Sequence, residues 1–147
     1  MGGRIITGAP AGAWVAEVLG RGYFAERSEA IGLERDGKIV AGVVYEEYCG
    51  ASVTCHIAFS GRLTSRYVAA IFDYPFNVAG VGKIIAPVSS GNAKALRVVK
   101  KMGFVEEGRI KDARPDGDIV MLTMTRDACR YLDARYGQKI TGTAAST

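Results

Sequence analysis

The pair Asp36-Gly37 constrains the fold of this sequence more than any other local feature. It separates two largely apolar runs at 30–35 and 38–46, and Asp-Gly is typical of two-residue hairpin turns because both turn residues adopt positive φ angles. A third run at 51–59 alternates larger apolar side chains with smaller or polar ones, as a strand with two different faces does. We therefore expect the first half of the chain to contain three antiparallel strands.

The spacing of apolar residues then changes from that of a strand to that of a helix. Residues 63–74 place apolar side chains three and four positions apart, and we expect Pro75 to end this helix, because proline disfavours the α region for the preceding residue. An apolar strand at 83–88 follows, and Asn92 is placed to cap a second helix that Gly103 ends. A strand, a helix and a strand in this order predict a parallel crossover, so the sheet should be mixed.

The remaining elements complete a single α/β domain. The chain has 147 residues, which is the size of one domain with one core. We place the domain at 1–136 and a small, polar, flexible tail at 137–147. The other predicted elements are a helix at 11–19, strands at 104–111 and 118–125 around the turn Pro115-Asp116-Gly117, and a closing helix at 126–136.

Composition excludes several classes of protein. Hydrophobic residues make up 48% of the chain and charged residues 23%, as in a globular protein, and no apolar run approaches the ~20 residues that cross a bilayer. We expect no signal peptide, no membrane partner and a cytoplasmic location. Three cysteines without metal-site spacing predict reduced thiols and no metal site. The formal net charge of +4 favours contact with phosphate, either in a nucleotide cofactor or in nucleic acid.

Pro87 lies inside the predicted strand at 83–88, although a proline removes a hydrogen bond from a central strand. Two explanations are open from the sequence. In the first, the strand ends at Ala86. In the second, the strands at 51–59 and 83–88 splay apart, so that no strand lies beside Pro87 on that side and no ladder hydrogen bond is lost there. A splayed pair would expose unpaired carbonyl and amide groups to a ligand.

Two stretches of the second half resemble the GNAT acyltransferase superfamily, in particular its branch of ribosomal-protein N-acetyltransferase-like proteins. The motif V-x-x-x-N-x-x-A is similar to Val88-Ser89-Ser90-Gly91-Asn92-Ala93-Lys94-Ala95, and the motif G-F-x-x-E-G to Gly103-Phe104-Val105-Glu106-Glu107-Gly108. Bacteriophage and prophage proteins of this kind have a stretch similar to Phe72-Asp73-Tyr74-Pro75-Phe76-Asn77. The motif segment is short, but the order of strands and helices fits nearly the whole predicted domain.

The resemblance implies a GNAT fold, in which helices flank a mixed, mostly antiparallel sheet of six or seven strands. It also implies that acetyl-coenzyme A, the acyl donor, lies between two splayed strands, with its pyrophosphate on backbone amides at the start of the following helix. In the family's phosphate loop this chain has Ser65 and Tyr67 where glycines are expected, and their side chains can obstruct the phosphate. Arginines in the loop add charged donors, and Thr64 or Ser65 can cap the helix. The residues expected to bind the cofactor are Ile57, Ala58, Phe59, Arg62, Thr64, Ser65, Arg66 and Asn92.

His56 and Glu46 are the catalytic candidates for direct acetyl transfer. His56 is the only histidine, and an imidazole titrates near neutral pH, although a histidine satisfied by a neighbouring strand would have no catalytic role. Glu46 or Glu47 could act as a base through water, and only one of them can face the site because the strand alternates. Many family members have a tyrosine acid seven residues after the capping asparagine, whereas this chain has Val99, so that a water or Tyr74 would have to replace it.

The second predicted helix carries a basic face, formed by Lys94, Arg97, Lys100 and Lys101. Such a face is typical of the solvated side of an amphipathic helix, although Lys94 or Arg97 could also contact the 3′-phosphate of the cofactor. Interleaved aromatic residues and a recognition helix are missing from the sequence, so we expect no nucleic-acid partner. A basic nucleic-acid-binding domain is the third and weakest alternative, and a salt-sensitive gel shift would test it.

The resemblance implies an acetyltransferase that moves an acetyl group from acetyl-coenzyme A directly to a primary amine of a small molecule or a protein. The alternative is a catalytically silent GNAT-fold protein with a binding or structural role, which the loss of the glycines and of the tyrosine favours. The acceptor pocket would include the hairpin at 111–118, but nothing in the sequence identifies the acceptor. Homodimers are common for the fold, and a phage-encoded member would act in the host cytoplasm.

Overall fold

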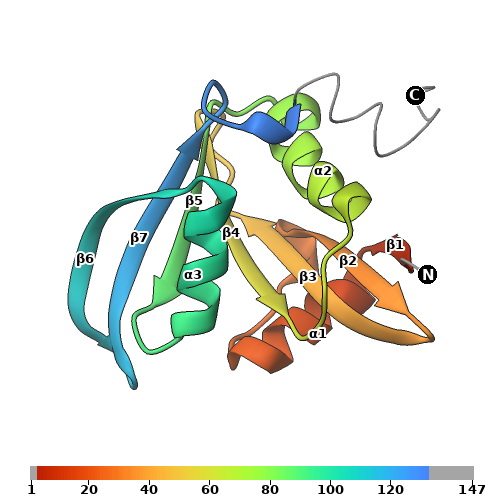
Figure 1. Ribbon diagram of the computed structural model, residues 1–147, viewed down its shortest axis with the longest axis horizontal. Coiled ribbons are helices and arrows are strands. Elements are labelled where there is room, and N and C mark those ends of the chain that lie inside the picture. Colours follow the sequence, from red (N-terminus) through yellow and green to blue (C-terminus); the bar gives the residue numbers. More distant parts are fainter. Residues whose placement is uncertain (1–2, 133–147) are drawn as a thin grey trace.

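A computed structural model describes residues 3–132 and contains one seven-stranded sheet in the order β1-β2-β3-β4-β5-β7-β6 (Figure 1). Neighbouring strands pair antiparallel, except that β4 and β5 are parallel. The strands are β1 (Arg4–Thr7), β2 (Glu29–Arg35), β3 (Lys38–Glu46), β4 (Ser52–Phe59), β5 (Lys83–Ser89), β6 (Val105–Arg114) and β7 (Gly117–Thr125). The helices are α1 (Ala9–Leu19), α2 (Ser65–Asp73) and α3 (Ala93–Met102), with the short turns η1 (Ala25–Arg27), η2 (Tyr74–Val78) and η3 (Arg130–Leu132). The predicted mixed α/β architecture is confirmed.

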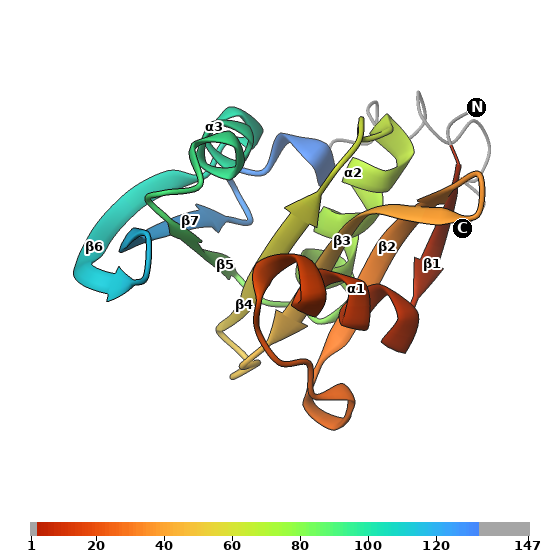
Figure 2. The ribbon, with the colours of Figure 1, turned by 90° about the horizontal axis from the view of Figure 1, so that it is seen from below.

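The helices form two layers, with α1 on one face of the sheet and both α2 and α3 on the other (Figure 2). The larger core lies on the α2 and α3 face, where Tyr67, Phe76 and Leu122 are almost fully buried. On the opposite face α1 packs tightly against β3, since a Cβ atom added at Gly42 would lie 2.5 Å from Cγ2 of Val15. Burial of these two apolar layers stabilises the sheet from both sides.

The hairpin and the helix caps form where the sequence predicts them. Asp36 and Gly37 have φ angles of 54° and 79°, so both turn residues are left-handed. The side chain of Asn92 accepts a hydrogen bond from the backbone N–H of Ala95 at 3.1 Å, and Gly103 ends α3 with a φ angle of 114°. These local signals act through neighbouring residues, which explains why the sequence alone reveals them.

Pro75 does not end the second helix in the predicted way. Tyr74 keeps α geometry, with φ −58° and ψ −56°, and the chain continues through the π-helical turn η2. The carbonyl of Ile71, which lies four residues before the proline and loses its helical donor, accepts a hydrogen bond from the Tyr45 hydroxyl at 2.6 Å. The π-turn closes through a bond from the Ala79 N–H to the Tyr74 carbonyl.

Two ends of the domain also differ from the sequence prediction. The edge strand β1 is an additional element, and it pairs with β2 through Ile5 and Leu33. The predicted helix at 126–136 is wrong over its described part, where residues 126–132 form turns and η3. Its last residues and the predicted tail at 137–147 lie outside the described residues. Within residues 3–132, no helix has the length and apolar character needed to span a membrane.

The strands β4 and β5 splay apart, as one of the two explanations for Pro87 requires. They pair at their first residues, up to the pair Thr54 and Ile85, and then diverge. Beyond that point β4 pairs with β3 and β5 pairs with β7, where Pro87 lies opposite Met121. Because β5 continues to Ser89, the explanation that the strand ends at Ala86 is wrong.

Candidate functional site

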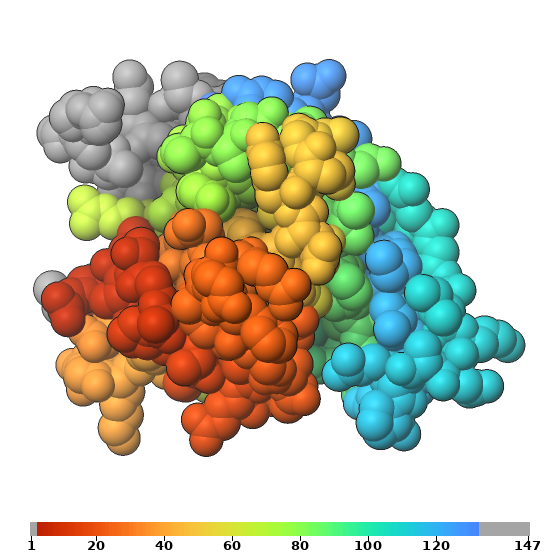
Figure 3. All heavy atoms as spheres, turned by 180° about the vertical axis from the view of Figure 1, so that it is seen from behind, coloured from red at the N-terminus to blue at the C-terminus, as the bar shows by residue number. Residues whose placement is uncertain are grey.

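A cavity of about 290 Å³ lies where β4 and β5 diverge. Its wall on the α2 and α3 side includes Ile57 of β4 and the start of α3. On the α1 side it opens into a cleft between the segment that follows α1 and the β6–β7 hairpin (Figure 3). Side chains from both faces of the sheet therefore border one space. The lining residues are Leu19, Arg21, Cys55, His56, Ile57, Ala86, Pro87, Val88, Ser89, Asn92, Ala95, Val99, Arg114 and Ile119.

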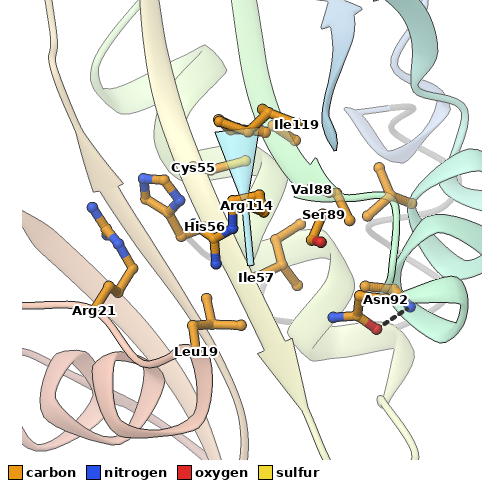
Figure 4. A pocket seen from close by; sticks show the side chains of 14 residues that line it. Leu19, Arg21, Cys55, His56, Ile57, Val88, Ser89, Asn92, Arg114 and Ile119 are labelled. Atoms are coloured by element: carbon orange, nitrogen blue, oxygen red, sulfur yellow. Dashed lines mark hydrogen bonds between the residues drawn. The ribbon is translucent and has the colours of Figure 1, made fainter. Parts of the chain in front are cut away.

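His56 belongs to a group of three charged or titratable side chains at the cavity wall. The Nε2 atom of His56 lies 2.8 Å from Oε2 of Glu46, and the Arg21 guanidinium donates a hydrogen bond of 2.7 Å to the same carboxylate oxygen. His56 pairs with Val44 in the β3–β4 ladder, so Glu46, two residues further along β3, shares its face of the sheet. Arg21 comes from the turn after α1 and lies beside His56 in Figure 4.

Burial and neighbouring charge set the protonation of this group. The side chains of His56 and Glu46 are each 14% exposed. Burial and the positive charge of Arg21 lower the pKa of His56 below its ordinary value of 6.5, against the opposing effect of Glu46. Burial raises the pKa of Glu46, but the hydrogen bond from Arg21 and the charges of His56 and Arg21 outweigh it, so the net shift is downward. At neutral pH we therefore take Glu46 as ionised and His56 as neutral.

This protonation assigns the two nitrogens of the imidazole. An ionised carboxylate can only accept hydrogen bonds, so the Nε2 atom of His56 must carry the proton that faces Glu46. The Nδ1 atom then has the free lone pair. Such an imidazole, oriented by a carboxylate through one nitrogen, can accept a proton at the other.

The start of α3 is tied to the β6–β7 hairpin at the cavity edge. The Ser89 hydroxyl donates to Asp116 at 2.6 Å, and the backbone N–H of Asp118 donates to the Ser90 hydroxyl at 2.8 Å. These bonds hold the hairpin beside the end of β5. They explain how Arg114, far from His56 in the sequence, comes to line the same cavity.

Lys94 connects α3 with the end of β4 across the splay. Its ammonium nitrogen lies 5.0 Å from the centre of the Phe59 ring, within the range of a cation–π contact. Phe59 and Lys94 both lie outside the cavity lining. The contact therefore joins the two diverging elements next to the cavity.

The missing glycines suggest that side chains obstruct the loop at the start of α2, but the side chain of Tyr67 does not. The Thr64 side chain caps the helix by accepting from the Tyr67 N–H at 3.0 Å, which confirms the predicted cap. Tyr67 is 1% exposed, and its hydroxyl donates to the carbonyl of Ile31 at 2.8 Å. The prediction that its side chain obstructs the loop is wrong, because the ring points into the core. Arg62, Ser65 and Arg66 are exposed at this helix start.

The structure brings together only part of the predicted site. His56, Ile57 and Asn92 line the cavity. Glu46 lies outside the lining and is hydrogen-bonded to His56. The side chain of Ala58 instead packs in the small core beside α1, on the opposite face from α3. The predicted residues outside the lining are Glu46, Ala58, Phe59, Arg62, Thr64, Ser65 and Arg66.

The tyrosine that we considered as a replacement acid does not lie at this cavity. Tyr74 lines a different hollow, near Tyr45 and Tyr48, and its ring packs against Tyr45 with centres 5.0 Å apart. Val99 is 1% exposed and lines the cavity with an apolar side chain. Among the described lining residues there is consequently no tyrosine.

Sequence reasoning missed two arginines of the site. Arg21 follows the helix-closing Gly20, and no motif marks it as a partner of Glu46. Arg114 precedes the turn Pro115-Asp116-Gly117, in the hairpin that was expected to shape an acceptor pocket, and its position there was the available signal.

Comparison with known proteins identifies the fold. No protein-family model matches the sequence, and no curated protein matches it significantly. Among solved structures, mutant forms of the spermidine/spermine N-acetyltransferase SpeG from Vibrio cholerae have a TM-score of 0.66, with 16% identity over 88% of this chain and 98% of theirs. The spermidine N-acetyltransferase from Vibrio cholerae in complex with CoA and spermine has a TM-score of 0.61, with 22% identity over 73% and 69%. A probable acetyltransferase has a TM-score of 0.60, with 17% identity over 69% and 62%.

At these identities the likeness shows the fold alone. The chain has the GNAT fold that its motifs predict, and its structural neighbours are acetyltransferases. The predicted branch of the superfamily and the similarity to phage proteins stay predictions.

Proposed function

We propose that this protein moves the acetyl group of acetyl-coenzyme A directly to a primary amine, with His56 as the general base. The observation that carries this proposal is that Arg21 and His56 line the cavity between β4 and β5 and are both hydrogen-bonded to Glu46, which lies outside the lining. A small-ligand site is expected to be a concave space with a few placed polar groups, and this cavity fits that description. The acetyltransferase neighbours, one of them in complex with CoA and spermine, support the choice of donor and of an amine acceptor.

The residues around the splay fit an acyl-coenzyme A. From residue 55 onward, no described strand pairs with the β5 side of β4, so the N–H and C=O groups on that side suit the amides of the pantetheine arm. Ile57 and Val99 supply apolar surface beside the strand, while Ala58 and Phe59 would contribute through their main chains. The start of α2, with Arg62 and Arg66, is the proposed phosphate site, because a helix N-terminus and guanidinium groups both favour anions.

His56 can remove the proton that the amine must lose. The Nδ1 atom accepts this proton as the amine nitrogen bonds to the thioester carbon. The Nε2 atom keeps its own proton and continues to donate a hydrogen bond to Glu46. When the carbon–sulfur bond breaks, the products are the N-acetylated amine and the thiolate of coenzyme A. The imidazolium can return its proton to that sulfur, so one histidine acts as base and then as acid.

Glu46 and Arg21 are positioning residues in this mechanism. The carboxylate fixes the tautomer of His56 and stabilises the imidazolium that forms during the reaction. Arg21 keeps Glu46 ionised by donating to the same oxygen that accepts from His56. Both act through His56 without any need to touch the substrates.

The first experiment is calorimetric titration of the protein with acetyl-coenzyme A. We expect micromolar binding that weakens at least tenfold in the variant Arg62→Ala/Arg66→Ala, because its two cations would meet the cofactor phosphates. The matched control is Lys100→Ala/Lys101→Ala, which removes the same charge from the far end of α3 and should leave the affinity unchanged. Absence of binding at millimolar ligand in the parent protein would contradict the proposal.

The second experiment measures acetylation of a panel of primary amines by mass spectrometry. The variant His56→Gln should lose at least a hundredfold in kcat/KM, which is the lower range for removal of a general base. Equal rates in the parent and the variant would contradict the role of His56.

A second candidate function is a catalytically silent GNAT-fold protein with a binding or structural role. It is favoured by the apolar Val99 and by the lack of a tyrosine among the described residues that line the cavity. Tight cofactor binding without any acetylated amine would support this candidate over the enzyme.

A further inference from the structure

Arg114 shares the cavity with His56 on the α1 side of the sheet. Residues directly opposite each other in an antiparallel ladder point to the same face, which places Ser89 with Ile119 and Arg114 with Gly117. Positions 117 and 119 of β7 are two residues apart and share one face, and the buried Val120, which follows Ile119, points to the opposite, α3 side. In Figure 4 the Arg114 guanidinium projects into the space between His56 and Ser89.

The described lining of the cavity is positively charged. It contains two arginines and the neutral His56, and it contains no carboxylate. Arg21 is neutralised by Glu46, whereas Arg114 makes no ion pair within residues 3–132. Two hairpin carboxylates, Asp112 and Asp116, each lie two residues from Arg114 in the sequence. Neither is part of the lining, and Asp116 accepts the Ser89 hydroxyl. One uncompensated cation therefore faces the open side of the cavity, where the acceptor would enter.

We infer that the acceptor amine carries an anionic group, a carboxylate or a phosphate, which Arg114 binds while the amine lies at His56. This inference rests on the proposed acetyl transfer and adds the class of acceptor. A guanidinium forms strong, often bidentate hydrogen bonds with both anions, so the shared chemistry is an oxyanion. The phosphates of coenzyme A do not explain Arg114, because their proposed site at α2 lies on the opposite face of the sheet.

The same charge disfavours an acceptor with several ammonium groups. A second ammonium beyond the reacting amine would approach Arg114 without a carboxylate in the described lining to compensate it. Selection would then arise from attraction of the anionic acceptor and from repulsion of the cationic one. This chain should therefore differ in acceptor from its spermidine N-acetyltransferase neighbours.

The test compares primary amines that differ only at the end remote from the amine. 4-Aminobutyrate, butylamine and 1,4-diaminobutane have the same carbon spacing and end in a carboxylate, a methyl group and an ammonium group. Amino acids with shorter and longer spacers scan the distance between the two groups, and 3-aminopropyl phosphate replaces the carboxylate by a phosphate. We expect kcat/KM for the best carboxylate or phosphate amine to exceed that of its methyl counterpart at least tenfold, with the diamine slowest.

Arg114→Gln should remove this preference selectively. The positive charge of Arg114 also lowers the pKa of His56, so the rates are compared at a pH where His56 is neutral in both proteins. We expect kcat/KM for the anionic amine to fall at least tenfold, mostly through KM, while the rate with butylamine stays within a factor of two. The matched control is Arg109→Gln, which removes the same charge from the same strand but from the face that carries Val120. A second readout is the NMR signal of His56, which the anionic amine should shift in the parent protein and not in Arg114→Gln.

The outcomes separate this inference from the proposed function. Acetylation of butylamine and 1,4-diaminobutane as fast as of the anionic amines, with no change in Arg114→Gln, would overturn the inference and leave acetyl transfer intact. Acetyl-coenzyme A binding with no acetylated product from any amine would overturn the proposed function, and the inference with it. A preference for the phosphate over the carboxylate amine would identify the anion and support the inference.

Discussion

Glu46→Gln should lower the pKa of His56 and move the acid limb of the activity profile to lower pH. The substitution keeps an amide oxygen that can accept from Nε2 and removes the negative charge that lies 2.8 Å from it. At that distance the bare Coulomb energy is about 6 kcal/mol for an effective dielectric constant of about 20, which sets an upper limit. Neighbouring charges shift pKa values by about 1–3 units in practice, and the pKa of His56 should fall by that amount.

The assay is NMR titration of tag-free protein with labelled histidine. His56 is the only histidine, so one signal reports its protonation directly. Arg21→Gln is the opposing variant, because it removes the cation that lowers the pKa of His56 and leaves Glu46 unpaired on that side. The pKa of His56 should therefore increase in the order Glu46→Gln, parent, Arg21→Gln.

The kinetic profile must follow the same order if His56 is the base. Since the neutral imidazole accepts the proton, kcat/KM should fall as the pH drops below the pKa of His56, and the acid limb should shift with the NMR value in each variant. An unchanged or raised pKa in Glu46→Gln would refute the electrostatic role assigned to Glu46. A pKa that shifts while the acid limb does not would refute His56 as the base.

Three further predictions concern stability. The folded protein binds a proton at His56 less readily than the unfolded chain does, because folding lowers the pKa of His56. The free energy of unfolding should therefore decrease as the pH falls from about 6.5 through the lower pKa of the folded protein. Denaturant titrations of His56→Gln should show a smaller decrease. Tyr67→Phe removes the hydroxyl that donates to the buried carbonyl of Ile31, and it should lower the free energy of unfolding, measured in urea, by about 1–3 kcal/mol. Calorimetry should show unchanged affinity for acetyl-coenzyme A. A loss of affinity would contradict the assignment of Tyr67 to the core. Gly42→Ala forces a methyl group against Val15 of α1 and should lower the melting temperature by an amount equivalent to about 1–3 kcal/mol, and no change in a thermal scan would contradict the close packing described.

Elements that depend on neighbouring residues could be predicted from the sequence. The turn at Asp36 and Gly37 requires positive φ angles, and Asn92 caps α3 through a backbone N–H three residues away. The alternation along β4 predicted which side chains share a face with His56. These signals predicted a mixed α/β domain, and the resemblance of residues 88–95 and 103–108 to the GNAT superfamily implied the GNAT fold.

Elements that depend on distant segments could not be predicted in the same way. Tyr45 satisfies the carbonyl that Pro75 leaves without a donor, and nothing near the proline reveals this partner. The sequence left the explanations for Pro87 open, because the divergence of β4 and β5 follows from how the whole sheet pairs.

The candidate site likewise combines features that the sequence reveals with features that depend on distant segments. The sequence identified His56 as the base candidate through its side-chain chemistry, and it identified Glu46 only as one of two alternatives. The tertiary structure decided that Glu46, Arg21 and His56 meet, and that Arg114 reaches the same cavity through the β6–β7 hairpin. The physical reason is range: turns and caps arise from interactions within a few residues, whereas the charge and protonation of the site arise from residues that only the folded sheet brings together.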